Sequence, residues 1–225
     1  MPTILGTGAH RYEVVDNWAK LPPGREFNAD VAAVGVDKQD RVYAFNRGKH
    51  PMVVLDRAGN FLRSWGEPGT DPGQFNIPHN ICCDADGWVY VADRENHRVQ
   101  VFDGSGKFET QWINMHRPSG LFMEHGGQGR FFVGEIGGGM GVNYDMPNIG
   151  PRVSIYSHKG ELLARLGQRP AGLEPGQFIS PHGLAVDSHG DIYVGEVSYT
   201  NWRNRYKEQP HPPGLRSLQK LVKVG

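Results

Sequence analysis

The sequence predicts an all-β fold, a β-propeller with four blades visible in the chain, and two observations lead to this prediction. One is a repeated unit: residues 78–93 begin with Pro-His, pass through an Asp/Gly turn and end in a strand, and residues 181–196 repeat this pattern. The other is composition, since 31 glycines and 16 prolines accompany many Val, Ile, Tyr and Phe residues. Short strands and tight turns that repeat roughly every 40 to 50 residues are typical of propeller blades.

Each repeated unit is expected to form the first two strands of a blade. The units lie at residues 31–46, 78–93, 118–135 and 181–196, and their turns contain the acidic residues Asp37, Asp84, Glu124 and Asp187. Third strands are expected at residues 52–55, 98–102, 152–156 and 218–224. Fourth strands are expected to end at Trp65, Trp112 and Leu166.

The last blade has no fourth strand of its own. The strand-like residues 11–15 near the N-terminus are available to complete it. We expect this N-terminal strand to close the last blade, because the pairing would remove two open sheet edges. The 225 residues are then a single propeller domain, residues 1–225.

Composition also restricts the class of function. Lys plus Arg and Asp plus Glu both number 24, so no overall basic field favours nucleic acid or a membrane surface. The adjacent cysteines Cys82 and Cys83 point to opposite faces of a predicted strand, which favours reduced packing residues over a disulfide. No secretory signal or membrane-length apolar run is visible. We therefore expect a soluble, cytoplasmic protein with no nucleic-acid or membrane partner.

Two histidines stand at the same point of two repeats. His79 and His182 each follow a proline at the start of a predicted innermost strand, where side chains can converge on the propeller axis, whereas Ser119 takes this position in the third unit. Two imidazoles are two of the three protein ligands that a catalytic zinc usually has. The alternative is a blade-entry motif whose imidazole bonds to backbone.

A second set of polar residues ends the second strands of the blades: Asn46, Asp93, Glu135 and Glu196. Such carboxylates could complete a metal shell, orient a metal-bound histidine or act as a general base. Asp93 lies in an Asp-Arg-x-x-x-Arg pattern that favours a structural ion pair instead. The Gly-rich insert at residues 137–150 is interpreted as a rim loop, and the basic, aromatic residues 199–207 as part of a long solvated loop.

Residues 45–50 (Phe-Asn-Arg-Gly-Lys-His), residues 91–100 and the two Pro-His units resemble the NHL-type propellers of the peptidyl-α-hydroxyglycine α-amidating lyase family over nearly the whole chain. The resemblance implies zinc held by three histidines, an assisting arginine and tyrosine, and cleavage of a C-terminal α-hydroxyglycine into a peptide amide and glyoxylate. His79 and His182 fall on ligand positions and Arg47 on the arginine. The family resembles six-bladed propellers, so two blades, the third histidine and the tyrosine have no counterpart here, and the gap lies at residues 64–68.

The sequence thus predicts a zinc-dependent, lyase-like enzyme for a small α-hydroxy or amide substrate, or a peptide C-terminus. Arg47, Glu135 and Glu196 are the predicted catalytic residues, and His79 and His182 the predicted metal ligands. One alternative is a non-catalytic NHL-repeat interaction module that uses the basic residues 202–207 and the channel rim. Another is a calcium-dependent sugar-lactone hydrolase, although calcium prefers oxygen ligands. A homo-oligomer is expected if the blades do not close into a ring.

Overall fold

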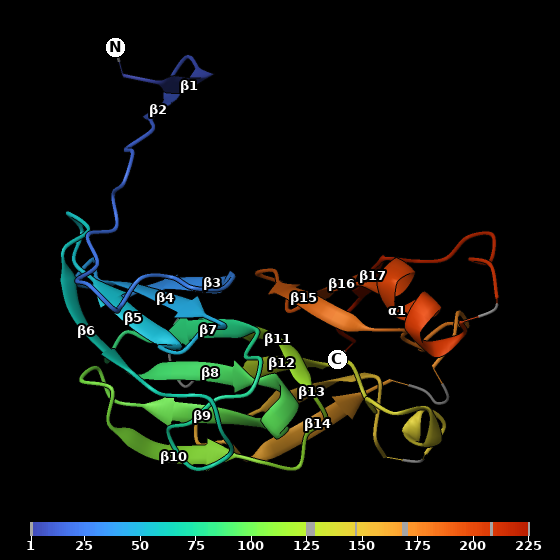
Figure 1. The fold of residues 1–225 in the computed structure, drawn as a ribbon. Coiled ribbons are helices and arrows are strands. Elements are labelled where there is room, and N and C mark those ends of the chain that lie inside the picture. Colours follow the sequence, from blue (N-terminus) through green and yellow to red (C-terminus); the bar gives the residue numbers. More distant parts are fainter. Residues whose placement is uncertain (1, 125–128, 147, 168–170, 208, 225) are drawn as a thin grey trace.

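The structure is a computed structural model that describes residues 2–124, 129–146, 148–167, 171–207 and 209–224. Its blades are four antiparallel sheets that follow one another in chain order (Figure 1). The predicted all-β class and four-blade arrangement are confirmed. Blade 1 comprises β3 (Val31–Val36), β4 (Val42–Asn46), β5 (Met52–Leu55) and β6 (Phe61–Trp65), and blade 2 comprises β7 (Asn80–Cys83), β8 (Val89–Asp93), β9 (Arg98–Phe102) and β10 (Phe108–Trp112). Blade 3 comprises β11 (Pro118–Met123), β12 (Phe131–Glu135), β13 (Arg152–Tyr156) and β14 (Leu162–Leu166), and blade 4 comprises β15 (Pro181–Val186), β16 (Ile192–Glu196) and β17 (Leu218–Leu221).

The acidic turn residues of the repeats shape the hairpin between the first two strands of each blade. In blade 2, one oxygen of Asp84 accepts the amides of Asp86 and Trp88, and the other accepts the Tyr90 hydroxyl at 2.9 Å. Equivalent bonds join Tyr43 to Asp37 at 3.1 Å and Tyr193 to Asp187 at 3.0 Å. The carboxylate therefore satisfies turn amides and the hydroxyl of a buried or partly buried tyrosine together, which explains why this pattern recurs along the sequence.

Apolar side chains fill each of the three seams between consecutive blades. One cluster joins blades 1 and 2, a second joins blades 2 and 3, and a third joins blades 3 and 4. At the second seam, the indole of Trp112 stacks on Tyr156 with ring centres 5.9 Å apart. A Cβ on Gly160 would meet that indole at 2.2 Å, and the φ of Gly160 is +82°, so both the close approach and the backbone conformation require glycine.

The N-terminal strand does not close blade 4, and this part of the prediction is wrong. Instead, β1 (Ile4–Thr7) and β2 (His10–Glu13) pair with each other in a hairpin that stands clear of the blades (Figure 1). The following segment is tied to blade 1, where the Lys20 amide bonds to the Gly59 carbonyl at 2.8 Å and the Trp18 indole bonds to the Arg57 carbonyl at 3.2 Å. Residues 11–13, which were predicted to pair with blade 4, pair with β1 instead, and the anchor ties the following segment to blade 1.

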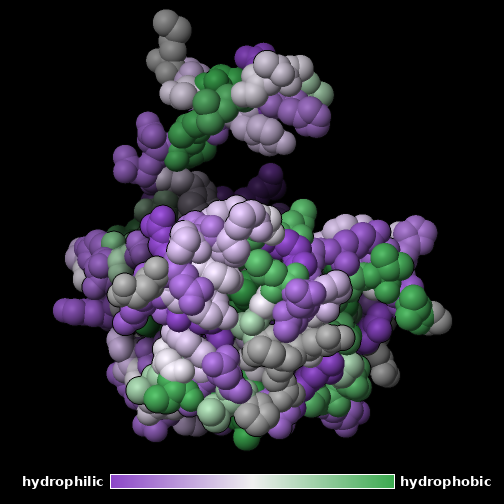
Figure 2. All heavy atoms as spheres, turned by 90° about the vertical axis from the view of Figure 1, so that its right-hand side faces the viewer, coloured by the Kyte–Doolittle hydropathy of each residue, from purple (hydrophilic) through white to green (hydrophobic). Residues whose placement is uncertain are grey.

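Consequently, blade 4 has three strands among the described residues, and β17 forms its outer edge. Beside that edge lies an apolar groove of about 520 Å³, lined by Phe132, Ile155, Leu166, Ile192 and Leu221, with Arg130, Arg165 and Lys223 at its sides. The hairpin also leaves apolar side chains exposed, Leu5 by 58% and Tyr12 by 69%, and Figure 2 shows it projecting from the body.

The structure has little helix in its described part. Two short 3₁₀ turns connect the second and third strands of their blades: η1 (Arg94–Asn96) lies between β8 and β9 of blade 2, and η2 (Gly141–Asn143) lies between β12 and β13 of blade 3. An α-helix, α1 (Ser198–Arg205), occupies most of the segment that was predicted to be a loop, so that prediction is wrong there. Tertiary contacts hold α1 in place, as described below. None of the helices in the described ranges is long and apolar enough to span a membrane.

The carboxylates at the ends of the second strands fix the chain that leads into each innermost strand. Asp93 accepts the amide of Asn76 at 2.7 Å, Glu135 accepts that of His116 at 2.6 Å, and Glu196 accepts that of Ile179 at 2.7 Å. Each acceptor receives the amide three positions before His79, Ser119 or His182. Asp93 and Glu135 are fully buried and pair with Arg98 and Arg152, at 2.9 and 2.8 Å.

We expect Glu135→Ala to destabilise the protein by about 3–5 kcal/mol, because it leaves the buried guanidinium of Arg152 without its partner. Urea unfolding at neutral pH followed by circular dichroism measures this change. The exposed Glu109 of the neighbouring blade provides the control, and Glu109→Ala should change the free energy of unfolding by less than about 0.5 kcal/mol. Equal effects of the two substitutions would contradict the structural role.

Candidate functional site

The structure brings His79 and His182 together at the entry of two innermost strands. His79 lies just before β7, and His182 is the second residue of β15. Their rings are 5.3 Å apart between centres, with an angle of 68° between planes, and both side chains are partly buried. Residues more than 100 positions apart in the sequence therefore meet, because β7, β11 and β15 pack side by side. We call His79 and His182 the histidine pair.

Two guanidinium groups point at the histidine pair. Arg94 Nη1 donates to His79 Nε2 at 2.6 Å, and Arg47 Nη2 lies 3.3 Å from the same nitrogen. The other ring nitrogen, Nδ1, donates to the Ile77 carbonyl at 3.1 Å. With the proton on Nδ1, the lone pair of the neutral ring lies on Nε2, which faces the arginines. Arg47 was a predicted site residue. Arg94 was interpreted only as part of a structural Asp-Arg pattern, although its place directly after β8 could have indicated it.

Both imidazoles are neutral at neutral pH. Burial, followed by the positive charge of Arg94, lowers the pKa of His79 from 6.5 to about 4. The hydrogen bond to Ile77 opposes this change, while Arg47 and His182 add to it. The pKa of His182 is also lowered, by burial first and then by Arg94 and Arg47. Neutral imidazole is the form that can accept a hydrogen bond or bind a metal.

Glu95 balances part of the positive charge around the pair. Its carboxylate contacts Arg94 Nε at 2.6 Å and Arg117 Nη2 at 2.9 Å. Arg47 has a weaker partner, since Asp30 is 3.9 Å away and its side chain is 85% exposed. A partly buried site with guanidinium groups in excess over close carboxylates favours an anion.

Glu135 and Glu196 do not join the histidine pair. Both oxygens of Glu135 are bonded, to Arg152, to the Ser154 hydroxyl and to the His116 amide. Glu196 accepts the amides of Ile179 and Ser180 and the Gln219 side chain. These contacts lie within each residue's own blade, and the catalytic roles predicted for the two glutamates stay predictions.

The third repeat contributes no imidazole to the pair. Ser119 stands at the histidine position in blade 3 and is 1% exposed, and its hydroxyl has no hydrogen-bond partner among the described residues. A Cβ on the next residue, Gly120, would meet the His182 carbonyl oxygen at 2.4 Å, so β11 and β15 approach closely here. Within the described part of the chain, no three His, Cys, Asp or Glu side chains are grouped as a metal site would require.

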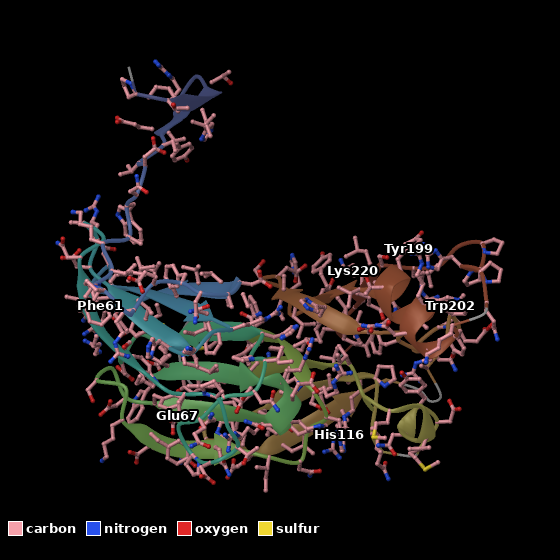
Figure 3. All side chains as sticks on the ribbon, in the orientation of Figure 1. Phe61, Glu67, His116, Tyr199, Trp202 and Lys220 are labelled. Carbon is pink, nitrogen blue, oxygen red and sulfur yellow. The ribbon has the colours of Figure 1, made fainter. Side chains whose placement is uncertain are left out.

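The sequence also gave no indication of a second contact between histidines. His97 lies between β8 and β9 of blade 2, and His116 lies in the segment that enters blade 3; their ring centres are 5.5 Å apart, and His116 is labelled in Figure 3. His97 ends η1, in the left-handed region with a φ of 56°. Burial lowers the pKa of each imidazole, which keeps this pair neutral too.

Comparison with protein-family models identifies an NHL repeat at residues 75–102, which is the core of blade 2. Among curated proteins, mouse NHL repeat-containing protein 3 is 47% identical over 166 residues, which are 65% of this chain and 42% of that protein. Peptidyl-glycine alpha-amidating monooxygenase B of Xenopus laevis is 32% identical over 154 residues, covering 62% of this chain and 16% of that protein. The chain thus spans less than half the length of these relatives.

Solved structures show the same fold at low sequence identity. The Kuenenia stuttgartiensis hydrazine synthase matches with a TM-score of 0.56 at 12% identity, over 80% of this chain and 46% of that one. A streptogramin B lyase matches with a TM-score of 0.52 at 13% identity, over 76% of this chain and 53% of that one. Together with the four sheets, these findings show that the chain is a four-bladed β-propeller that contains an NHL repeat.

Proposed function

We propose that the histidine pair and its two arginines bind the carboxylate of a peptide C-terminus or a small α-hydroxy acid, and that with zinc the site acts as a lyase of the peptidyl-α-hydroxyglycine type. The observation that carries this proposal is the position of two neutral imidazoles beside two guanidinium groups. Similarity to the amidating monooxygenases over about three fifths of the chain supports the reaction type.

The arginines supply the carboxylate recognition. A guanidinium donates through a planar fork that matches the two oxygens of a carboxylate. In the structure, Arg47 and Arg94 direct N–H groups at His79, a neutral partner that a carboxylate would readily replace. Glu95 holds Nε of Arg94 while Nη1 faces the pair, so the guanidinium is oriented before a ligand binds.

The histidine pair fits zinc in spacing and falls short of it in number. Two imidazoles on one tetrahedral zinc, with Zn–N bonds of about 2 Å, have ring centres about 5 Å apart; the rings of His79 and His182 are 5.3 Å apart. A catalytic zinc takes three protein ligands, and the described residues supply two. The Nε2 lone pair of His79 now accepts from Arg94, so zinc and Arg94 would compete for it. When bound, zinc polarises a coordinated oxygen as a Lewis acid.

In the proposed reaction, the bond between the amide nitrogen and the hydroxyl-bearing carbon breaks. The hydroxyl loses its proton and becomes the aldehyde oxygen of glyoxylate, and the nitrogen gains a proton and leaves as the peptide amide. This chain's contribution is to hold the substrate carboxylate with Arg47 and Arg94, which places the adjacent carbon at the histidine pair. Glu135 and Glu196 have no part in this scheme, because their oxygens are already bonded within their blades.

A non-catalytic NHL-repeat binding module is the second candidate. The specific observation in its favour is the incomplete donor set, with Ser119 at the position of a third imidazole and Arg94 on the His79 lone pair. Such a module would bind the same carboxylate ligands without turning them over. Metal content and turnover distinguish the two candidates.

We expect the purified chain to contain about one equivalent of zinc and to release glyoxylate from a peptide ending in α-hydroxyglycine. His182→Ala should abolish both properties, because one imidazole cannot hold the ion alone. The exposed His158 supplies the matched control, and His158→Ala should change neither zinc content nor rate. Elemental analysis and a glyoxylate assay give the two readouts.

Turnover by metal-free protein, unaffected by His182→Ala, would contradict the zinc-dependent lyase. Protein without zinc or turnover, whose binding of a C-terminal glycine peptide is weakened by Arg47→Met, would instead establish the binding module. Loss of one charge-assisted contact should weaken that binding about tenfold.

In metal-free protein, the imidazole of His79 should titrate near pH 4, and Arg94→Met should raise this pKa toward 6.5. Because the folded-state pKa lies below the unfolded value, the unfolded chain takes up the proton first as pH falls. His79 therefore lowers folding stability progressively from about pH 6.5 down to pH 4. Histidine NMR titration with a chelator present measures the pKa. A His79 pKa above 6 in the unmodified chain would contradict the described environment.

A further inference from the structure

The Gly-rich insert and α1 enclose a small polar pocket beside the candidate site. The pocket has a volume of about 150 Å³, and its lining includes Arg117, Tyr144, Ile179, Asn201 and Arg205. This space accommodates one short side chain or several waters. Figure 3 shows α1, with its labelled residues Tyr199 and Trp202, beyond the blade 4 strands, next to the segment that contains the insert.

Contacts from both sides hold the pocket in shape. Asn201 of α1 donates to the hydroxyl of the fully buried Ser180 at 2.6 Å, which fixes the helix on blade 4. Arg205, at the end of α1, donates to the Tyr144 carbonyl at 3.0 Å and lies over the Tyr144 ring at 4.3 Å, which joins the helix to the insert. A Cβ on Gly138 would meet the Asn143 Cβ at 2.8 Å, so the insert is folded tightly on itself.

The charges around the pocket favour an anion. Two guanidinium groups line it, and no carboxylate of the described part of the chain does. Glu95 neutralises Arg117, whereas Arg205 has no carboxylate within salt-bridge distance in the described ranges. The nearby Asp145 lies outside the lining and acts on Arg205 only through its field. Arg205 therefore provides a partly buried positive charge whose π and carbonyl contacts leave it free to bind a carboxylate.

Two connections link this pocket to the histidine pair. Arg117 bonds to Glu95, Glu95 bonds to Arg94, and Arg94 bonds to His79. On the other side, Ile179 lines the pocket three positions before His182. These contacts form a continuous line from the pocket to His79, along which a ligand held at the pair by one end would extend its next group.

We propose that this pocket is a specificity subsite for an acidic side chain, Asp or Glu, immediately before the C-terminal group of a peptide ligand. The inference rests on the proposed function in that the C-terminal carboxylate binds at the histidine pair. Arg205 is the residue that selects the acidic side chain, with the Asn201 and Asn204 amides beside it.

The test is calorimetric binding of two peptides to the full chain, N-acetyl-Ala-Glu-Gly and N-acetyl-Ala-Gln-Gly. We expect the Glu peptide to bind about tenfold more tightly, as one charge-assisted contact implies. Arg205→Met should reduce this ratio to about one without weakening the Gln peptide. Arg203→Met, an exposed change on the same helix, should keep the ratio.

Arg205→Lys provides a second variant, which retains a cation near Tyr144. It controls for the possibility that Arg205→Met acts by displacing α1. It should keep part of the preference. An equal affinity for the two peptides in the unmodified chain, or a preference that survives Arg205→Met, would overturn the subsite.

A separate experiment distinguishes failure of the proposed function at the histidine pair from failure of the subsite. If neither peptide binds, the Arg205 Nε–H resonance, assigned by its loss in Arg205→Met, is followed during titration with N-acetylglutamate and N-acetylglutamine. A shift with N-acetylglutamate alone supports the subsite and rejects the carboxylate site at the pair. No shift, or a shift produced equally by inorganic phosphate, rejects the subsite.

Discussion

The hydrogen bonds that Asp93, Glu135 and Glu196 accept from backbone amides are the constraint on which the candidate site depends. Each carboxylate ends a second strand and fixes the segment that enters the innermost strand of the same blade. Since the accepted amide lies three positions before His79, Ser119 or His182, the same bond sets the start of each innermost strand. Burial strengthens these bonds, because their acceptors are kept from water.

The electrostatics of the site follow from this arrangement. Packing of β7 against the neighbouring innermost strands partly buries the imidazoles, and the nearby guanidinium groups then keep them uncharged. Positive charge therefore resides on Arg47 and Arg94, and the lone pairs reside on the histidines. The same His79 nitrogen can serve Arg94 or a metal ion, so ligand, metal and arginine are coupled at one atom.

The two glutamates illustrate how repeat position and role differ. Glu135 and Glu196 occupy the position of Asp93 in their blades, and the sequence placed all of them near one face. Their surroundings determine their bonding partners. Both side chains are buried, and their carboxylates bond to backbone amides and to polar side chains of their own blades. Arg94, which directly follows Asp93, projects toward the histidine pair instead.

The sequence by itself determined the all-β class, the four repeats and the equivalence of His79 and His182, because turn chemistry and strand periodicity are local properties. Tertiary structure alone decided that these histidines meet, that Arg94 joins them and that α1 forms where a loop was expected. It also placed the N-terminal strand in its own hairpin and tied the following segment, at Lys20, to blade 1. Such outcomes depend on contacts between segments that are far apart in the chain, and no local sequence pattern encodes which of these contacts form.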